Sequence, residues 1–215
     1  MKRRMFFVFI LFVSLQTFLF ADEGVEKANE IKDTLDIERP YFFDIVKQNY
    51  HVGSEFTLLS KDIPPSRVKK SRFRIRTNYD LANSDGWEAT GITRFFSFGQ
   101  FFKWAKQIDI YDTQWNYVGG IYGKMLTTAT ACYKICDFND NCIAYSYVDR
   151  GGRGVVVQDR NMESNIIFQM TRNYELDVED MWNVAVFQPK HIDSRIIRIF
   201  SSFIVDLQDS FKKDR

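Results

Sequence analysis

Apolar and polar residues alternate through most of the chain between residues 41 and 187, and this alternation is typical of half-buried β-strands. The pattern is clearest in two consecutive stretches that repeat each other at an offset of 133 − 108 = 25 residues. The first stretch is Ile108–Asp112 followed by Asn116–Gly119, and the second is Tyr133–Asp137 followed by Asn141–Ala144. Each stretch predicts a β-hairpin, because two alternating runs are joined through residues that favour turns.

The same alternation, together with many aromatic residues, predicts further strands on both sides of the two hairpins. These strands are Phe42–Val46, Glu55–Ser60, Arg72–Tyr79, Trp87–Phe96, Val155–Asp159, Ile166–Thr171 and Trp182–Phe187. In total the pattern predicts about eleven or twelve strands with turn signals between them. A meander of this length has to close or pack against itself to hide its edges, so we predict a mainly β barrel or sandwich.

After Pro189 the hydrophobic period changes from that of a strand to that of a helix, and we predict a helix over residues 193–211. The apolar positions are Ile196, Ile199, Phe200, Phe203, Ile204, Leu207 and Phe211. Asp193 or Ser194 can cap the first turn by accepting hydrogen bonds from free backbone N–H groups. The opposite face carries Arg195, Arg198, Ser202, Asp206 and Asp209. The apolar stripe must be buried, so the helix is expected to pack in or against the β-structure.

Residues 1–21 have the pattern of a secretory signal peptide. Three basic residues precede the apolar run Met5–Phe20, and Ala21 offers a small residue for cleavage. We therefore expect export to the periplasm, the cell envelope or the medium, with an uncleaved anchor as the alternative. Residues 22–40 form a charged lead-in with the spacing of a short helix, and residues 41–215 form one domain.

Composition and motifs indicate no enzyme. The 29 basic and 28 acidic residues of the full chain become 26 and 28 without the signal, a net charge of −2 that does not suggest nucleic-acid binding. The chain has two histidines, His51 and His191, and no G-x-S-x-G, H-E-x-x-H or P-loop motif. Asp112 and Asp137 recur at equivalent positions, but we interpret them as turn residues rather than paired catalytic carboxylates. We predict no cofactor and no metal, since the spacing of oxygen ligands in residues 137–141 matches no EF-hand loop.

Three cysteines, Cys132, Cys136 and Cys142, lie in the second hairpin. If Ile135 and Ile143 face each other inward, the register places Cys136 opposite Cys142 on the outer face. An exported protein meets an oxidising compartment, so a Cys136–Cys142 disulfide is one interpretation. Three free thiols that behave as small hydrophobic residues are the other.

A cluster of basic residues is the strongest candidate for a ligand site. Arg72, Arg74 and Arg76 alternate with apolar residues, which predicts three guanidinium groups on one strand face, and Lys69 and Lys70 precede them. Guanidinium groups bind phosphate well because they donate two hydrogen bonds at once. The alternative interpretation is a solvated strand face whose charges discourage pairing with another chain.

The order of these parts resembles the tubby C-terminal-like superfamily, in particular its LURP-one-related and phospholipid scramblase branch. The resemblance is carried by Thr93–Gly99 ahead of the first hairpin, by the two hairpins, by Trp182–Val184, and by Ile192 and Asp193 at the start of the last helix. It implies a closed antiparallel barrel of twelve strands around a hydrophobic C-terminal helix. The polar face of the helix departs from this picture, so either internal pairing satisfies it or the helix emerges from one end.

The expected function is that of an exported, non-enzymatic binding module. The resemblance points to an anionic lipid or another phosphorylated or hydrophobic ligand, because tubby-like domains bind phosphoinositides. The alternative is a secreted or envelope protein that binds a protein partner and uses the barrel as a scaffold. A lipocalin-like carrier would need a hollow barrel, which the C-terminal helix would fill.

Overall fold

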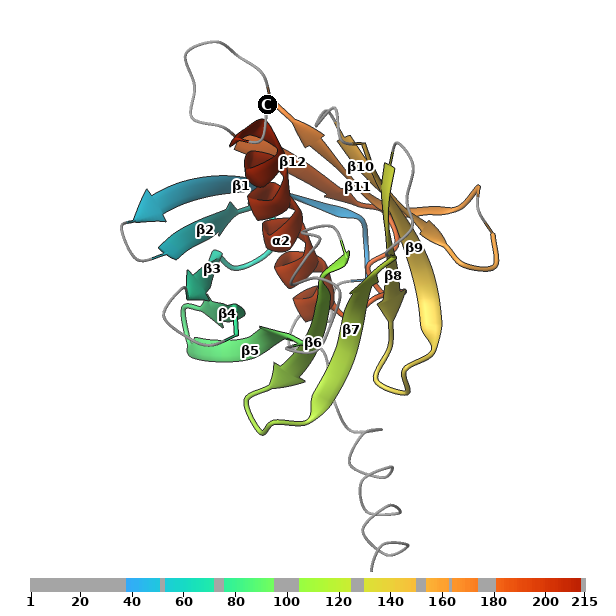
Figure 1. Cartoon of the computed structure of the whole chain (residues 1–215). Coiled ribbons are helices and arrows are strands. Elements are labelled where there is room, and N and C mark those ends of the chain that lie inside the picture. Colours follow the sequence, from blue (N-terminus) through green and yellow to red (C-terminus); the bar gives the residue numbers. More distant parts are fainter. Residues whose placement is uncertain are drawn as a thin grey trace, which may run out of the picture. The chain divides into compact units, whose positions relative to one another are not determined.

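The computed structural model describes residues 38–50, 53–71, 76–94, 105–124, 130–149, 154–162, 164–173 and 181–213, without the side chains of 130, 131, 149 and 209–213. Within this part of the chain twelve strands form one closed antiparallel barrel, and each strand pairs with its neighbours in sequence (Figure 1). The barrel closes where β12 pairs with β1, with Tyr41 opposite Val186. The fold prediction, a closed antiparallel barrel of about twelve strands with a C-terminal helix, is confirmed.

The strands are β1 (Tyr41–Tyr50), β2 (Gly53–Leu59), β3 (Ser66–Ser71), β4 (Asn78–Asn83), β5 (Gly86–Thr93), β6 (Gln107–Asp112), β7 (Tyr117–Gly123), β8 (Thr130–Cys136), β9 (Cys142–Asp149), β10 (Gly154–Asp159), β11 (Ile166–Arg172) and β12 (Met181–Val186), and the helix is α2 (Ser194–Lys213). The predicted strand Arg72–Tyr79 is wrong in its bounds, because β3 ends before it and β4 begins near its end. Two of the inward-facing residues of β3, Ser66 and Lys70, are polar, so the alternation of this strand is hidden in the sequence.

The two predicted hairpins, β6–β7 and β8–β9, have equivalent turns. In each turn the carboxylate of the first residue, Asp112 or Asp137, accepts hydrogen bonds of 2.8–3.0 Å from the backbone N–H groups two and four residues later. Trp115 and Asp140 occupy the same position in their turns and have positive φ angles of 65° and 61°. The interpretation of the two aspartates as turn residues is therefore confirmed.

A β-bulge follows the turn in each of four hairpins, where one residue of the returning strand has no partner. The four bulged residues are Glu88, Val118, Ile143 and Ile167. Glu88, Val118 and Ile167 are buried, and Glu88 is the charged member of the set. A bulge at the same place after the turn thus positions an apolar side chain in the core in some hairpins and a carboxylate in the β4–β5 hairpin.

Helix α2 runs through the interior of the barrel (Figure 1). Every residue from Ser194 to Gln208 is buried, which requires protein on all sides of the helix. Aromatic rings from β4, β8 and β11 pack against Phe200 and Phe203 with centroids 5.4–6.1 Å apart. Asp193 is the N-cap, because its carboxylate accepts a hydrogen bond of 2.8 Å from the backbone N–H of Arg195.

Strand direction fixes which connections share an end of the barrel. Because neighbouring strands are antiparallel, the connections that follow β2, β4, β6, β8, β10 and β12 lie at one end, where α2 also begins. We call this the turn end. No helix in the described part of the chain is both long and apolar enough to cross a membrane.

Candidate functional site

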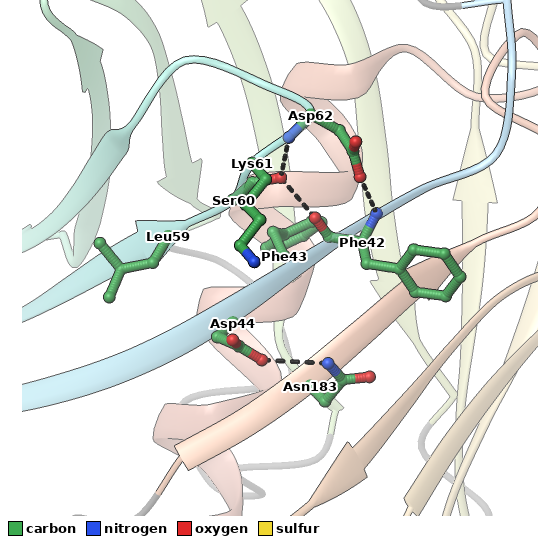
Figure 2. Close-up of a pocket in the computed structure, with 8 residues that line it drawn as sticks. All are labelled: Phe42, Phe43, Asp44, Leu59, Ser60, Lys61, Asp62 and Asn183. Carbon is green, nitrogen blue, oxygen red and sulfur yellow. Dashed lines mark hydrogen bonds between the residues drawn. The ribbon is translucent and has the colours of Figure 1, made fainter.

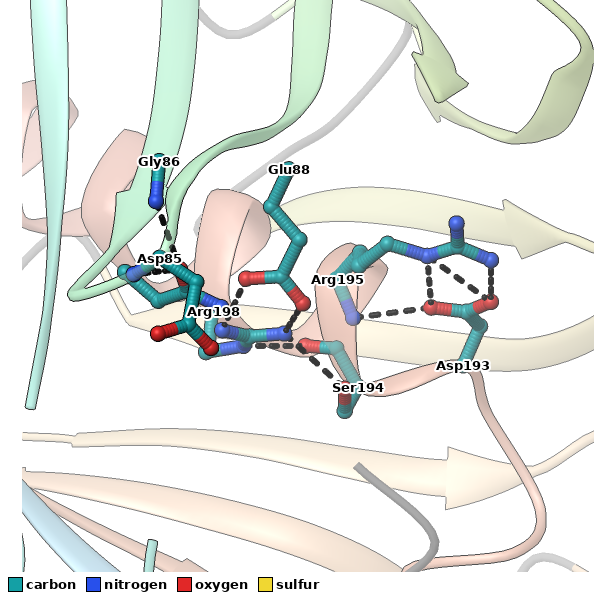
Figure 3. Close-up of polar contacts among 8 residues, drawn as sticks. Asp85, Gly86, Glu88, Asp193, Ser194, Arg195 and Arg198 are labelled. Atoms are coloured by element: carbon teal, nitrogen blue, oxygen red, sulfur yellow. Dashed lines mark hydrogen bonds and ion pairs between the residues drawn. The ribbon is translucent and has the colours of Figure 1, made fainter. Parts of the chain in front are cut away.

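The polar face of α2 is satisfied inside the barrel. Near the helix start, Arg198 donates two hydrogen bonds to the bulged Glu88, at 2.8 and 2.6 Å, and a third of 3.1 Å to the hydroxyl of Ser194 (Figure 3). Only 1% of Arg198 and 5% of Glu88 is exposed to solvent. Arg195 pairs in the same way with Asp193, with one N–O distance of 2.5 Å. Of the two alternatives that the sequence left open, internal pairing is the correct one.

A second buried ion pair lies further along the helix, around Asp206. The carboxylate accepts hydrogen bonds from Lys70 at 2.6 Å, from Lys47 at 3.3 Å and from the hydroxyl of Tyr79 at 3.2 Å. Burial alone would raise the pKa of Asp206, but the nearby ammonium groups of Lys70 and Lys47 outweigh it and lower that pKa. The pKa of Tyr79 is raised well above its usual value, first by burial and then by the negative charge of Asp206.

These contacts divide the basic residues that the sequence grouped together. Lys70 points into the barrel toward α2, whereas Lys69 is exposed on the outside and lies opposite Glu55 and Asp80 in the register of the neighbouring strands. Including Lys70 in an outward anionic-ligand site is therefore wrong, since its ammonium group is already bound to a buried carboxylate. Arg76 is exposed in the connection before β4.

Arg72 and Arg74 lie outside the described residues, as do residues 95–99 of the segment that carried the family resemblance. A shared strand face for the three arginines is not found, because Arg76 does not belong to a strand. The described residues therefore offer Lys69 and Arg76 as the exposed members of the predicted basic site.

Cys136 and Cys142 are opposite each other in the register of β8 and β9, as predicted, but the inward partner of Ile135 is Ala144 and not Ile143. The bulge at Ile143 causes this difference. All three cysteines are free thiols in this structure, and burial raises the pKa of Cys136 to about 12. The disulfide stays a prediction.

An open pocket of about 470 Å³ lies on the outside of β1, between β12 and the connection after β2 (Figure 2). Its polar groups bond to one another: Asn183 donates to Asp44 at 3.0 Å, and the backbone N–H of Phe42 donates to Asp62 at 3.4 Å. The remaining lining residues are Phe43, Leu59, Ser60 and Lys61. No group of His, Cys, Asp and Glu side chains among the described residues could hold a metal ion.

The most distinctive outer feature is a cluster of four aromatic side chains, Trp87, Tyr111, Trp115 and Tyr117, which we call the aromatic surface. The rings of Trp87 and Trp115 are 5.9 Å apart, Trp115 and Tyr111 are 6.2 Å apart, and Tyr111 and Tyr117 are 5.9 Å apart. Trp87 is 41% exposed and Trp115 is 60% exposed. The cluster therefore extends from the start of β5 across the β6–β7 hairpin and presents two large indole rings to solvent.

A hydrogen-bond network fixes one side of the aromatic surface. The hydroxyl groups of Tyr117 and Tyr122 are 2.7 Å apart, and Tyr122 also contacts Asp109 and Asp140, both at 3.1 Å. Arg94 forms a bidentate pair with Asp109, at 2.7 and 2.8 Å. Burial, with smaller contributions from nearby carboxylates, raises the pKa values of Tyr117 and Tyr122 above the usual value.

Gly120 makes this network sterically feasible. A Cβ atom at this position would overlap the ring of Tyr122 and lie 2.8 Å from the hydroxyl of Tyr117. The two tyrosines meet over the missing side chain. In the register of β6 and β7, Tyr111 and Tyr117 lie directly opposite each other.

Sequence reasoning did not find the whole aromatic surface, because Trp87 and Trp115 come from different hairpins. Comparison with known proteins adds no family assignment: no family model matches the chain, and no curated protein matches it.

Proposed function

We propose that this chain is an exported, non-enzymatic binding module, in which the filled barrel is a scaffold and the aromatic surface binds a protein partner. The observation that carries the proposal is the pairing of a filled interior with exposed indole rings. Helix α2 occupies the barrel, so a ligand held in the lumen, as in a lipocalin, has no space there. Binding must therefore use the outside of the barrel.

The composition of the aromatic surface favours a protein partner. Trp, Tyr and Arg are the residue types that most often supply binding energy at protein interfaces. Trp87 and Trp115 are only partly buried in this chain, and their contact with Tyr111 and Tyr117 restricts their motion before binding. A preorganised aromatic cluster loses little conformational entropy when a partner covers it.

We also propose membership of the tubby C-terminal-like superfamily. The proposal is supported by the agreement between the architecture that the resemblance implies, a twelve-stranded barrel around a C-terminal helix, and the architecture found here. Export is part of the proposal and rests on the pattern of residues 1–21. Mass spectrometry of the mature protein should find Asp22 at its N-terminus, and a mature protein that retains Met1 would contradict this.

Anionic lipid is the competing ligand, and the described residues lend it less support. Lys70 faces the interior, and Lys69 lies between two acidic residues, Glu55 and Asp80, on the neighbouring strands. The test is a variant with Arg72, Arg74 and Arg76 changed to Gln, added to liposomes that contain anionic lipids. We expect the parent protein not to bind these liposomes, so that the variant and the parent give the same result. Salt-sensitive binding that the variant loses would favour the lipid hypothesis over ours.

The main experiment compares three forms of the mature protein as bait in extracts of the native envelope and medium. They are the parent, Trp87→Ala/Trp115→Ala, and a control that changes two exposed aromatic residues elsewhere, Tyr50→Ala/Tyr147→Ala. We expect at least one protein that the parent and the control retain and the tryptophan variant loses, while all three melt cooperatively. The proposal would be refuted if all three forms retained the same proteins, or if the bound species were a lipid.

A further inference from the structure

We infer that the partner contacts the aromatic surface with a basic segment, rich in Arg or Lys and interspersed with apolar side chains. This inference rests on the proposed function and specifies the chemistry of its partner. It follows from two independent features of the turn end, the distribution of exposed apolar side chains and the sign of the charge around them.

Exposed apolar side chains gather at the turn end. Of the eight large hydrophobic residues that are exposed in the described part of the chain, six lie at or next to a turn-end connection. These six are Phe42, Leu59, Trp87, Trp115, Met162 and Phe187. Tyr50 and Tyr147 are the two that do not. Apolar exposure concentrated on one end of a domain marks an interaction surface rather than scattered surface residues.

The charge at the same place is negative. Four hairpin turns, residues 83–87, 112–116, 137–141 and 159–165, carry five aspartates and one arginine among their described residues, a net charge of −4. These residues are Asp85, Asp112, Asp137, Asp140, Asp159 and Arg160. The mature chain as a whole has a net charge of only −2, so acidic residues are concentrated in these four turns, two of which carry Trp87 and Trp115. A partner that fits this end must therefore be positively charged.

The geometry brings the two features together at the tryptophans. Asp85 lies two residues before Trp87, and Asp140 accepts a hydrogen bond from Tyr117 within the aromatic surface. Two basic groups act on Tyr111 from the strand side: Arg94 is paired with Asp109, and Arg76 lies in the connection between β3 and β4, at the opposite end of the barrel from the turn end. A guanidinium or ammonium group over an indole ring gains cation–π attraction, and the nearby carboxylates attract the same cation by Coulomb interaction. An anionic membrane would be repelled by the same carboxylates.

The test measures binding of a fluorescently labelled oligoarginine peptide by anisotropy, with an oligoglutamate peptide of equal length as the reference probe. The key variant is Asp85→Asn/Asp140→Asn. Asp140 has a positive φ angle, which Asn tolerates, so the backbone of this turn can keep its conformation. The matched control, Asp44→Asn/Glu55→Gln, also removes two negative charges, but from β1 and β2. We expect the key variant to bind the cationic peptide roughly fivefold more weakly than the control does.

A second variant pair separates cation–π attraction from apolar contact. Trp115→Phe keeps an aromatic face, whereas Trp115→Leu keeps apolar surface without one. We expect Trp115→Leu to bind the cationic peptide about threefold more weakly than Trp115→Phe. The affinity of the parent should also fall from low to physiological ionic strength, a measurement that needs no variant.

The possible failures are distinguishable from failure of the proposed function. Equal affinity for the two peptides, or equal loss in the key variant and the control, overturns the basic-partner inference. The peptide experiment can give one of these results while the capture experiment still finds proteins that need Trp87 and Trp115. In that case the aromatic surface binds a protein partner, but one of different chemistry. If no capture depends on these tryptophans, the proposed function itself is refuted.

Discussion

Changing Glu88 to Gln should strongly destabilise the barrel, because it leaves the guanidinium of Arg198 without its counter-charge in a site closed to water. The pair makes two charge-assisted hydrogen bonds, at 2.6 and 2.8 Å, and only 1% of Arg198 is exposed. Hydrogen bonds to charged groups contribute about 1.5–3 kcal/mol each. Removing one partner of a buried ion pair costs about 3–5 kcal/mol. We therefore expect the free energy of unfolding to fall by about 3–5 kcal/mol.

The assay is equilibrium unfolding in urea, followed by tryptophan fluorescence, with Trp182 as a fully buried reporter. The double variant Glu88→Leu/Arg198→Met tests the cause, because replacing both charges by apolar side chains of similar size removes the unpaired charge. It should recover most of the stability that Glu88→Gln loses. Lys190→Gln is the control, since it breaks the exposed pair with Glu38 and should leave the unfolding midpoint unchanged.

An unfolding midpoint of Glu88→Gln equal to that of the parent protein would show that the buried pair does not hold the helix start in place. A double variant that is as unstable as Glu88→Gln would show that the loss comes from altered packing at the bulge. Either result would refute the reasoning from an unpaired buried charge.

Three further predictions follow from the interior and from the β8–β9 hairpin. The pKa of Asp206 is lower in the folded than in the unfolded state, so its charge stabilises the fold above about pH 4, and that contribution is lost as the pH falls through the lower pKa. Asp206→Asn should therefore flatten the acid side of the curve of stability against pH. Parallel curves for the variant and the parent would contradict this. Gly91→Ala should destabilise by about 1–3 kcal/mol in a thermal melt, since its Cβ would lie 2.9 Å from a methyl group of Ile199, and Ile199→Ala should cost less in this background than alone. Peptide mapping without reduction should find a Cys136–Cys142 link in protein from an oxidising compartment, whereas three alkylatable thiols would exclude it.

The sequence determined the β architecture because its signals are local. Alternation, Asp and Asn at the turns and a repeat of 25 residues require only neighbouring residues to be read, and each hairpin forms from a contiguous stretch. The 3.6-residue period of residues 193–211 likewise predicted the helix, whereas the choice of Asp193 over Ser194 as its N-cap came from the structure. The strand β3 was missed for the opposite reason, since polar Ser66 and Lys70 face the interior and interrupt the local pattern.

Only the tertiary structure decided which charges are buried and which aromatic side chains meet. Glu88 and Arg198 are 110 residues apart in the sequence, and they pair because a bulge in β5 turns the carboxylate toward a helix that fills the barrel. Trp87 and Trp115 meet because β5 pairs with β6, which places the ends of the β4–β5 and β6–β7 hairpins side by side. Local sequence patterns specify each strand and its two faces. The partner of each side chain depends on the register between paired strands and on the packing of the helix inside the barrel, and both are set by the tertiary structure.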